Sequence, residues 1–305
     1  MKYFETKQLE AFSAVVSIGS MTGAAKAIGR SQPVITRLIQ DLEAEVGFAL
    51  LHRNGPRISP TAQGLAFSEQ VEVFLSGLRA IGDRAEAIEK SEQLPIQIAA
   101  VPALASSLLP STLANIPPDL LPNKIHIQSI SSENVVQAVI ARTAEIGVAS
   151  WPLDNPGIEV HWQAEVQCNA VVSVDHPLAG LSAIAATDLK NQRLIVAANP
   201  YRLRMPIEEA LTAHNIGMSS VIDCNATYVS LSLARKNLGV AIVEPLTAIG
   251  LPLDGVRVIP LTFRIPFRWS VITAIGRPLS AATEVIIREM RKTALAEVPS
   301  VVTID

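Results

Sequence analysis

From Pro95 onward the chain alternates short strand-like segments with helix-like segments, and this alternation is the strongest constraint on its fold. Apolar runs such as residues 95–101 and 193–198 are each followed by a segment with helical spacing. Repeated βα units form a mostly parallel sheet with helices on both of its faces. In such sheets, ligands bind outside the carboxyl ends of the strands. We therefore expect an α/β ligand-binding domain over residues 91–305.

Small polar residues follow several of these predicted strands. They occupy residues 102–107, 129–134, 199–204 and 225–228. Several of these segments begin helices, whose free N–H groups and positive dipole ends attract carboxylates and similar anions. Tyr201 and Arg202 add an aromatic surface and a fixed charge suited to a small polar ligand. Ordinary N-capping with a solvent-facing Arg202 explains any single one of these residues equally well.

The first 60 residues contain three predicted helices separated by stop and start signals. Gly19 can end the first helix in a left-handed conformation, and Ser20 is a good N-cap for the second. Ser31 can cap a third helix, with Pro33 in its first turn, where a missing N–H is tolerated. The small Ala24 on the second helix would let another helix pack closely.

The third helix has one apolar and one polar face. Ile35 and Ile39 belong to the side expected to be buried, whereas Thr36, Arg37 and Gln40 lie on the other side. In helix-turn-helix proteins the second helix of the motif enters the major groove, where Arg suits guanine and Gln suits adenine. The pattern therefore favours a DNA-reading helix over the alternative, a plain helical bundle with a solvated face.

A basic, hairpin-like segment follows this helix directly. Asn54 and Gly55 form a typical hairpin turn between Arg53 and Arg57. The whole chain has a net charge of −3, but residues 1–60 carry seven basic and five acidic side chains. An anionic partner should therefore meet the N-terminal part of the chain.

Residues 61–90 carry an apolar series with heptad spacing. Its steps alternate between four and three residues over about three heptads, which is typical of a helix that packs along another helix. A second subunit is the simplest source of that helix, and packing on the body of the same chain is the alternative. The expected dimerisation residues are Phe67, Val71, Phe74, Leu78, Ile81 and Ile88.

Nothing in the sequence indicates catalysis or metal binding. The chain lacks nucleophile-elbow, P-loop, dinucleotide-binding and HExxH motifs, and its histidines show no metal-ligand spacing. Cys168 and Cys224 are far apart and are interpreted as free thiols. No apolar run approaches the roughly 20 residues that span a bilayer, and the N-terminus lacks the apolar run of a signal peptide. We expect a cytoplasmic protein that is not an enzyme and has no metal, cofactor or membrane partner.

The N-terminal residues closely resemble those of the LysR-type transcriptional regulators. Thr36 departs from the pattern, because the family commonly has Ser there, so the base sequence that the helix reads stays open. The matching positions are Leu9, Phe12, residues 19–22, Ala24, Ala25, residues 31–33, Ile39, Leu42, Glu43, Val46, Gly47, Leu50, Arg53, Thr61 and Gly64.

This resemblance implies a winged helix-turn-helix DNA-binding domain over residues 1–60, a dimerising linker helix over 61–90, and a periplasmic-binding-protein-like effector domain over 91–305. The effector domain would consist of two βα subdomains, one of about residues 95–160 and 262–292 and an inserted one of about 161–261. The implied partners are double-stranded promoter or operator DNA, a small-molecule effector, further copies in a homodimer and homotetramer, and RNA polymerase. The residues expected at DNA are Ser31, Gln32, Pro33, Thr36, Arg37, Gln40, Arg53 and Arg57.

Residues 226–250 and 265–281 look most like the branch that contains the lysine-biosynthesis activator and the opine sensors. An amino acid or amino-acid conjugate is therefore the implied effector, bound in the cleft between the two subdomains. Carried over position by position, that cleft would be lined by Ser106, Ser107, Ser131, Ser132, Trp151, Asn199, Tyr201, Arg202 and Thr227. One alternative remains open, a small-molecule sensor whose N-terminal helices serve assembly instead of DNA binding.

Overall fold

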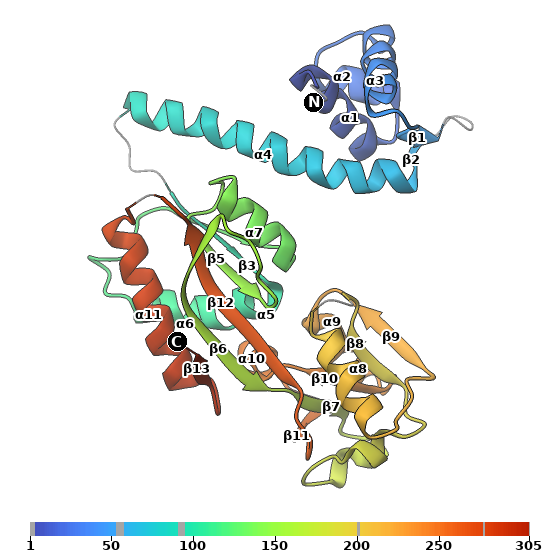
Figure 1. The fold of residues 1–305 in the computed structure, drawn as a ribbon, viewed down its shortest axis with the longest axis vertical. Helices are drawn as coiled ribbons and strands as arrows, with labels where there is room; N and C mark the ends of the chain where they lie inside the picture. The colour runs from blue at the N-terminus through green and yellow to red at the C-terminus, as the bar shows by residue number, and fades with distance from the viewer. Residues whose placement is uncertain (1–3, 53–57, 91–94, 200–201, 277, 305) are drawn as a thin grey trace. The chain divides into compact units, whose positions relative to one another are not determined.

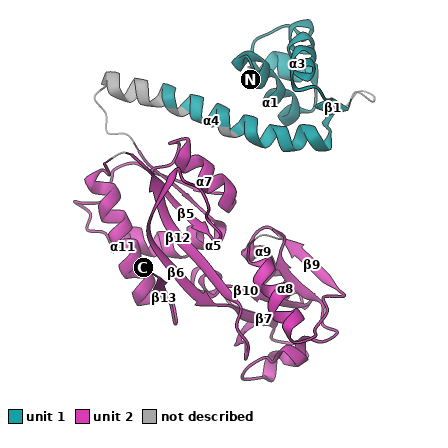
Figure 2. Ribbon diagram, viewed as in Figure 1, with its two compact units in different colours: residues 1–92 teal, residues 93–305 magenta. Residues whose placement is uncertain are grey.

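Two compact units make up the chain in the computed structural model, residues 1–92 and 93–305 (Figure 2). The structure describes residues 4–52, 58–90, 95–199, 202–276 and 278–304. Each unit has hydrophobic clusters of its own. Among the described residues, no helix combines the length and the apolar character needed to cross a membrane.

In the described part of the first unit, four helices accompany a short antiparallel hairpin (Figure 1). Gly19 ends the first helix with a φ of 69°, and the Ser20 hydroxyl caps the second by accepting a hydrogen bond from Gly23 N at 3.3 Å. Ser31 precedes the third helix with extended backbone, but its hydroxyl makes no capping hydrogen bond. The elements are α1 (Thr6–Ile18), α2 (Met21–Ala27), α3 (Gln32–Val46), β1 (Leu51–His52), β2 (Ser59–Pro60) and α4 (Ala62–Lys90).

The core of the first unit lies between α1, α2, α3 and the N-terminal half of α4. Phe12, Ile35 and Ile39 are completely buried in it. Phe67 of α4 contributes its ring, whose centroid lies 5.7 Å from that of Phe12, and Val71 is buried in the same cluster. The beginning of the heptad series therefore packs on the helix-turn-helix core of its own chain.

The second unit contains a six-stranded sheet with the order β13-β6-β12-β5-β3-β4 (Figure 1). Its strands β3, β4 and β5 are parallel, whereas β12 runs antiparallel to both β5 and β6, and β13 runs antiparallel to β6. The strands are β3 (Ile96–Ala100), β4 (Ile125–Ser129), β5 (Ile146–Ser150), β6 (Ile158–Gln167), β12 (Pro266–Ala274) and β13 (Val302–Ile304).

A five-stranded sheet with the order β11-β7-β10-β8-β9 completes the second unit. Strands β8, β9 and β10 are parallel, and β7 and β11 are antiparallel to their neighbours. Both sheets are thus mixed, where the βα alternation predicted a mostly parallel arrangement. The strands are β7 (Asn169–Ser173), β8 (Leu194–Ala197), β9 (Val221–Cys224), β10 (Val240–Val243) and β11 (Val256–Pro260).

The antiparallel strands arise because the chain crosses between the two sheets twice. The first crossing runs from β6 through Cys168 into β7, and the second runs from β11 through residues 261–265 into β12. Helices cover both faces of each sheet, as the hydrophobic clusters show. They are α5 (Pro102–Ser106), α6 (Leu108–Asn115), α7 (Ser132–Ile140), α8 (Arg204–Ala213), α9 (Thr227–Arg235), α10 (Pro245–Gly250) and α11 (Ala281–Glu297).

Candidate functional sites

Helix α3 carries an exposed polar face on the first unit. Its apolar side is anchored by Ile35, Ile39 and Leu42, which are all 0 % exposed. On the other side the Arg37 side chain is 85 % exposed, with its Nε 3.8 Å from the carboxylate of Asp41. A salt bridge between side chains this exposed is weak, so Arg37 can leave Asp41 for another partner.

The other residues expected at DNA lie around Arg37 on the same face. Ser31, Gln32, Pro33 and Gln40 are exposed. Thr36 is half-buried, and its hydroxyl donates to the Gln32 carbonyl oxygen at 3.1 Å and accepts from Gln32 Nε2 at 3.0 Å. The remaining two residues of the prediction, in the loop between β1 and β2, lie outside the described residues: Arg53 and Arg57.

Glu43, at the C-terminal end of α3, connects this helix to the hairpin. Its Oε1 accepts hydrogen bonds from the backbone N–H groups of Leu50 and Leu51, at 2.8 and 3.2 Å. This role of Glu43 could not be predicted from the sequence, because a bond from a helix side chain to a backbone seven residues away leaves no periodic signal. Glu43 thereby fixes where the hairpin begins relative to the exposed face of α3.

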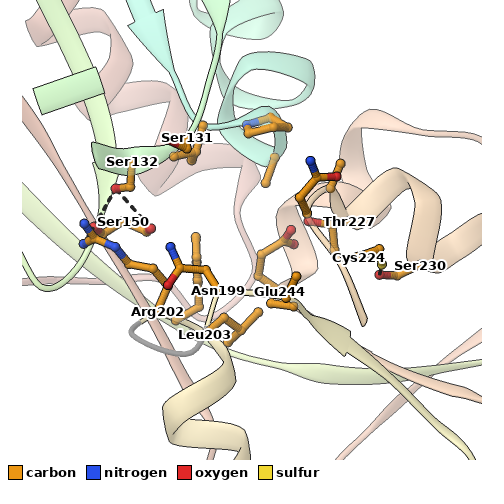
Figure 3. Close-up of a pocket in the computed structure, with 18 of the residues that line it drawn as sticks. Ser131, Ser132, Ser150, Asn199, Arg202, Leu203, Cys224, Thr227, Ser230 and Glu244 are labelled. Atoms are coloured by element: carbon orange, nitrogen blue, oxygen red, sulfur yellow. Dashed lines mark hydrogen bonds between the residues drawn. The ribbon is translucent and has the colours of Figure 1, made fainter. Parts of the chain in front are cut away.

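A cavity of about 530 Å³ lies in the second unit, where the carboxyl ends of the three parallel strands of each sheet meet. The cavity wall includes residues that directly follow or end these strands (Figure 3). Phe267 of β12 and Leu203 add apolar surface. The polar and charged lining residues are Ser131, Ser132, Glu133, Ser150, Asn199, Arg202, Cys224, Asn225, Thr227, Ser230 and Glu244.

Arg202 connects the two sides of the cavity. Its Nε lies 2.8 Å from Oε1 of Glu133 in the first turn of α7, and its Nη1 donates to the Ser150 carbonyl oxygen at 2.6 Å and to that of Pro152. Asn199 Nδ2 donates to the same Glu133 oxygen at 3.2 Å. These bonds join the loop after β8, in the five-stranded sheet, to elements of the six-stranded sheet.

The two carboxylates of the cavity have opposite protonation behaviour. Partial burial acts to raise the pKa of Glu133, but its own backbone N–H and the Arg202 guanidinium stabilise the ionised form and hold that pKa below its ordinary value. Glu244 is 1 % exposed, and burial raises its pKa to about 7 despite hydrogen bonds from Thr247 and Thr227. One carboxylate is thus paired and ionised, whereas burial favours the protonated form of the other.

Five of the nine residues predicted to line the effector cleft line this cavity: Ser131, Ser132, Asn199, Arg202 and Thr227. Ser131 caps α7, and the buried Ser132 hydroxyl donates to the Ser150 carbonyl oxygen at 2.8 Å. Figure 3 shows the Arg202 guanidinium beside Ser150 on one side of the cavity and the Glu244 carboxylate beside Thr227 on the other.

Of the other four predicted residues, the three that the structure describes are not among the lining residues of the cavity. Helix α5 begins only two residues after β3, so Ser106 and Ser107 lie at its far end, where their hydroxyls donate to the backbone carbonyl oxygens of Pro102 and Ala103. Trp151 Nε1 donates to Ser270 Oγ at 2.8 Å. Tyr201 lies outside the described residues.

Sequence reasoning missed Glu133, Ser150 and Glu244 as lining residues. Glu244 had a usable signal, since an acidic residue between an apolar run and a proline marks the carboxyl end of a buried strand. Ser150 had none, because its contribution depends on how β5 is placed beside β3.

These two sites define a class of protein: a helix-turn-helix DNA-binding unit joined to an α/β unit that encloses a cavity for a small ligand, with polar and charged residues on an otherwise apolar wall. Residues 6–65 match the family described as "Bacterial regulatory helix-turn-helix protein, lysR family", and residues 89–295 match "LysR substrate binding domain". The chain belongs to the LysR family of transcriptional regulators.

Individual proteins agree with this assignment. The chain is 32 % identical over 245 residues to the octopine catabolism/uptake operon regulatory protein OccR of Rhizobium meliloti, covering 80 % of each chain. It is 28 % identical over 244 residues to the regulatory protein NocR of Agrobacterium fabrum, covering 80 % of this chain and 81 % of NocR. Among solved structures, full-length CbnR in complex with its target DNA has the same fold, with a TM-score of 0.64, 22 % identity and coverage of 95 % of this chain and 100 % of CbnR.

Proposed function

We propose that this regulator reads a promoter or operator with the polar face of α3 and is controlled by an amino acid or amino-acid conjugate bound in the cavity of the second unit. The observation that carries the proposal is that cavity, where six strand ends and, among the described residues, three charged side chains surround about 530 Å³. A space of this size is in the range of pockets that bind small molecules.

The chemistry of the cavity wall supports a ligand with a carboxylate. Helices α7 and α9 both begin at the cavity, with Ser132 and Thr227 as their first residues. At α7 the first-turn N–H groups already bind the Ser131 hydroxyl and the Glu133 carboxylate. No side chain caps α9, so its free backbone N–H groups and the positive end of its dipole can stabilise an anion. The name of OccR refers to octopine, an amino-acid conjugate, and a ligand of that class suits the size of this cavity and the combination of apolar surface and charged groups on its wall.

The DNA-reading assignment rests on the exposure of α3. Arg37 and Gln40 are exposed on one face, at a spacing that lets both approach base edges in a major groove. Ser31, Gln32 and Thr36 surround them and are suited to position the backbone through phosphates. Arg53 and Arg57 of the hairpin loop would add phosphate contacts beside the groove.

The proposed assembly is a homodimer through α4, with two dimers forming a homotetramer. Phe74, Leu78 and Ile81 are exposed apolar residues on one side of this helix, as a helix-helix seam requires. Two α3 helices would then contact a dyad-related DNA site. Such an assembly would act on DNA in the cytoplasm, with RNA polymerase as a further partner, and the ligand would change the spacing or bend of the bound DNA.

The experiment that tests DNA reading is binding of full-length Arg37→Ala to DNA upstream of the protein's own gene. If Arg37 reads a base, specific binding should weaken by about 1–3 kcal/mol, whereas binding to random DNA should change little. Affinities measured by fluorescence anisotropy at several salt concentrations separate the two contributions, because phosphate contacts set the salt dependence.

The matched control is Arg257→Ala, which removes an exposed arginine from β11 in the second unit and should leave DNA affinity unchanged. Equal loss on specific and random DNA would assign Arg37 to phosphate contact. Absence of any binding by the wild-type protein at low salt would contradict the proposal and favour N-terminal helices that serve assembly alone.

A further inference from the structure

Glu244 is a buried carboxylate on the cavity wall without a cationic partner among the described residues. Its Oε2 accepts from Thr247 N at 3.1 Å, and its Oε1 accepts from the Thr247 hydroxyl. A further hydrogen bond comes from the Thr227 side chain. All three donors are neutral, whereas Glu133 on the same wall is paired with Arg202 at 2.8 Å.

The charges around Glu244 leave the cavity with an excess of negative charge whenever Glu244 is ionised. Glu133, Glu244 and Arg202 are its charged lining residues among those described, and Arg202 is already paired with Glu133. Cys168 lies close enough to Glu244 that burial and the Glu244 charge together raise the pKa of its thiol, which keeps it neutral. Cys224, also at the wall, is 3.0 Å from Ser230 Oγ. No group among these compensates an ionised Glu244.

Burying an ionised carboxylate without a counter-charge is unfavourable, because the charge loses its hydration. At neutral pH a buried carboxyl group avoids this cost in one of two states, by keeping its proton or by forming an ion pair with a cation. Burial favours the first state in the ligand-free protein, since it raises the pKa of Glu244 to about 7. A cationic group that enters the cavity would favour the second state, because an opposite charge within a few ångströms stabilises the ionised carboxylate.

We propose that Glu244 recognises a cationic nitrogen of the effector, an ammonium or guanidinium group, and gives up its proton as that group binds. This inference rests on the proposed effector cavity and narrows its ligand to a cationic or zwitterionic amino acid or conjugate. Thr247 and Thr227 orient the carboxylate from α10 and α9, so that only its charge state changes on binding.

Proton release makes the affinity depend on pH. A guanidinium or ammonium ligand stays charged between pH 6 and 8, whereas free Glu244 passes from mostly protonated to mostly ionised. The protonated form must lose its proton before the ion pair forms, so affinity for a cationic ligand should be about tenfold lower at pH 6 than at pH 8.

The test is isothermal titration calorimetry of the full-length protein with matched pairs of probes. L-Arginine is compared with uncharged-side-chain L-citrulline, L-lysine with L-norleucine, and octopine is added as a larger guanidinium ligand. We expect at least a tenfold loss of affinity when the recognised cation is removed, either by replacing a charged side chain with its neutral counterpart or by replacing the α-ammonium with a hydroxyl group. Titrations in two buffers of different ionisation enthalpy should report proton release at pH 7. A 2-hydroxy-acid analogue of the tightest probe tells an α-ammonium from a side-chain cation as the group recognised.

Glu244→Gln keeps the shape and the capping oxygen but cannot ionise. This variant should lose at least tenfold in affinity for the cationic probe, and the remaining binding should no longer depend on pH. Thr247→Val removes the hydroxyl donor while keeping the charge of Glu244, so it should retain the pH dependence. A Glu244→Gln protein that still binds the cationic probe with wild-type affinity, or probes that bind without pH dependence or proton release, would overturn the inference.

The variant Arg202→Ala distinguishes failure of this inference from failure of the proposed function. If uncharged or anionic ligands bind best and Arg202→Ala abolishes their binding, the effector cavity stands and the role of Glu244 is overturned. If no cationic probe binds more tightly than its counterpart, and the 2-hydroxy-acid analogue binds as tightly as its parent amino acid, neither a side-chain cation nor an α-ammonium is recognised and the inference is likewise overturned. If a ligand binds tightly and its affinity changes in neither Glu244→Gln nor Arg202→Ala, the proposal that this cavity binds the effector is overturned as well.

Discussion

At the scale of single residues, two glycines of α4 differ in the space around them, because one is in close contact with backbone atoms and the other is open. A Cβ added at Gly64 would lie 2.0 Å from the Leu50 carbonyl oxygen, which already accepts a hydrogen bond from Thr61 N, whereas a Cβ at Gly82 meets nothing within 4 Å. We expect Gly64→Ala to destabilise the first unit by about 1–3 kcal/mol, because helix and hairpin must separate. Gly82→Ala should stabilise its helix by up to about 1 kcal/mol. Urea unfolding of the two full-length variants measures both changes.

The pair carries its own control, because the same methyl group is added to the same helix. If both substitutions changed the free energy of unfolding equally, helix propensity alone would account for the changes. In that case α4 would not lie against the Leu50 backbone. If the Gly64→Ala protein were destabilised but bound DNA with normal affinity, the contact between Gly64 and the Leu50 backbone would contribute to stability but would not determine the position of α3.

The residue scale is also where sequence reasoning succeeded least. It placed Ser131, Ser132 and Thr227 at strand ends, and the structure brings these residues to one cavity. It placed Ser106 there as well, but the immediate start of α5 after β3 carries that residue a helical turn away from the strand end. Strand ends are visible in a sequence as changes of composition, whereas the length of the turn that follows is decided by packing.

At the scale of elements, α4 divides its apolar residues between two tasks. Val71 is buried in the core of its own unit, whereas Phe74, Leu78 and Ile81 are 48 %, 39 % and 67 % exposed. We expect Ile81→Asp to raise the dimer dissociation constant at least tenfold, because a charge in a helix-helix seam loses its water without gaining a partner. Sedimentation equilibrium over a range of protein concentrations measures the constant.

Leu65 supplies the matched control. It is an apolar residue of the same helix, 55 % exposed, that lies on the face opposite to the Ile81 seam. Leu65→Asp should therefore leave the dimer intact. If both aspartates weaken assembly equally, the seam is not the interface, and if neither does, the copies associate through another surface.

Helix α4 also shows what periodicity can and cannot predict. The heptad spacing indicated a helix over residues 61–90, and the structure has one at Ala62–Lys90. It assigned Phe67 and Val71 to a partner subunit, although both pack in the core of their own unit. The side chain of Ile88 lies outside the described part of the chain. The spacing of apolar residues identifies which of them share one face of a helix. It does not show whether that face packs on the same chain or on a second subunit.

At the scale of the whole molecule, the sequence predicted an N-terminal helical unit and a C-terminal α/β unit. The direction of the strands was the part that could not be predicted. Residues 158–167 and 266–274 have the composition of ordinary strands, yet each begins or ends at a crossing between the sheets and therefore runs antiparallel to its neighbours. Strand direction depends on where the chain enters the sheet, which is a property of the complete path.

Because the two units have separate hydrophobic clusters, they should unfold in separate steps. Ile39 and Ile286 offer one substitution in each unit, since both are 0 % exposed and belong to different clusters. An isoleucine-to-alanine change in a core costs about 2–5 kcal/mol. We expect differential scanning calorimetry of the full chain to show two transitions, with Ile39→Ala lowering the melting temperature of one by several degrees and Ile286→Ala that of the other. A single transition, or two that shift together in either variant, would mean that the units unfold as one cooperative body.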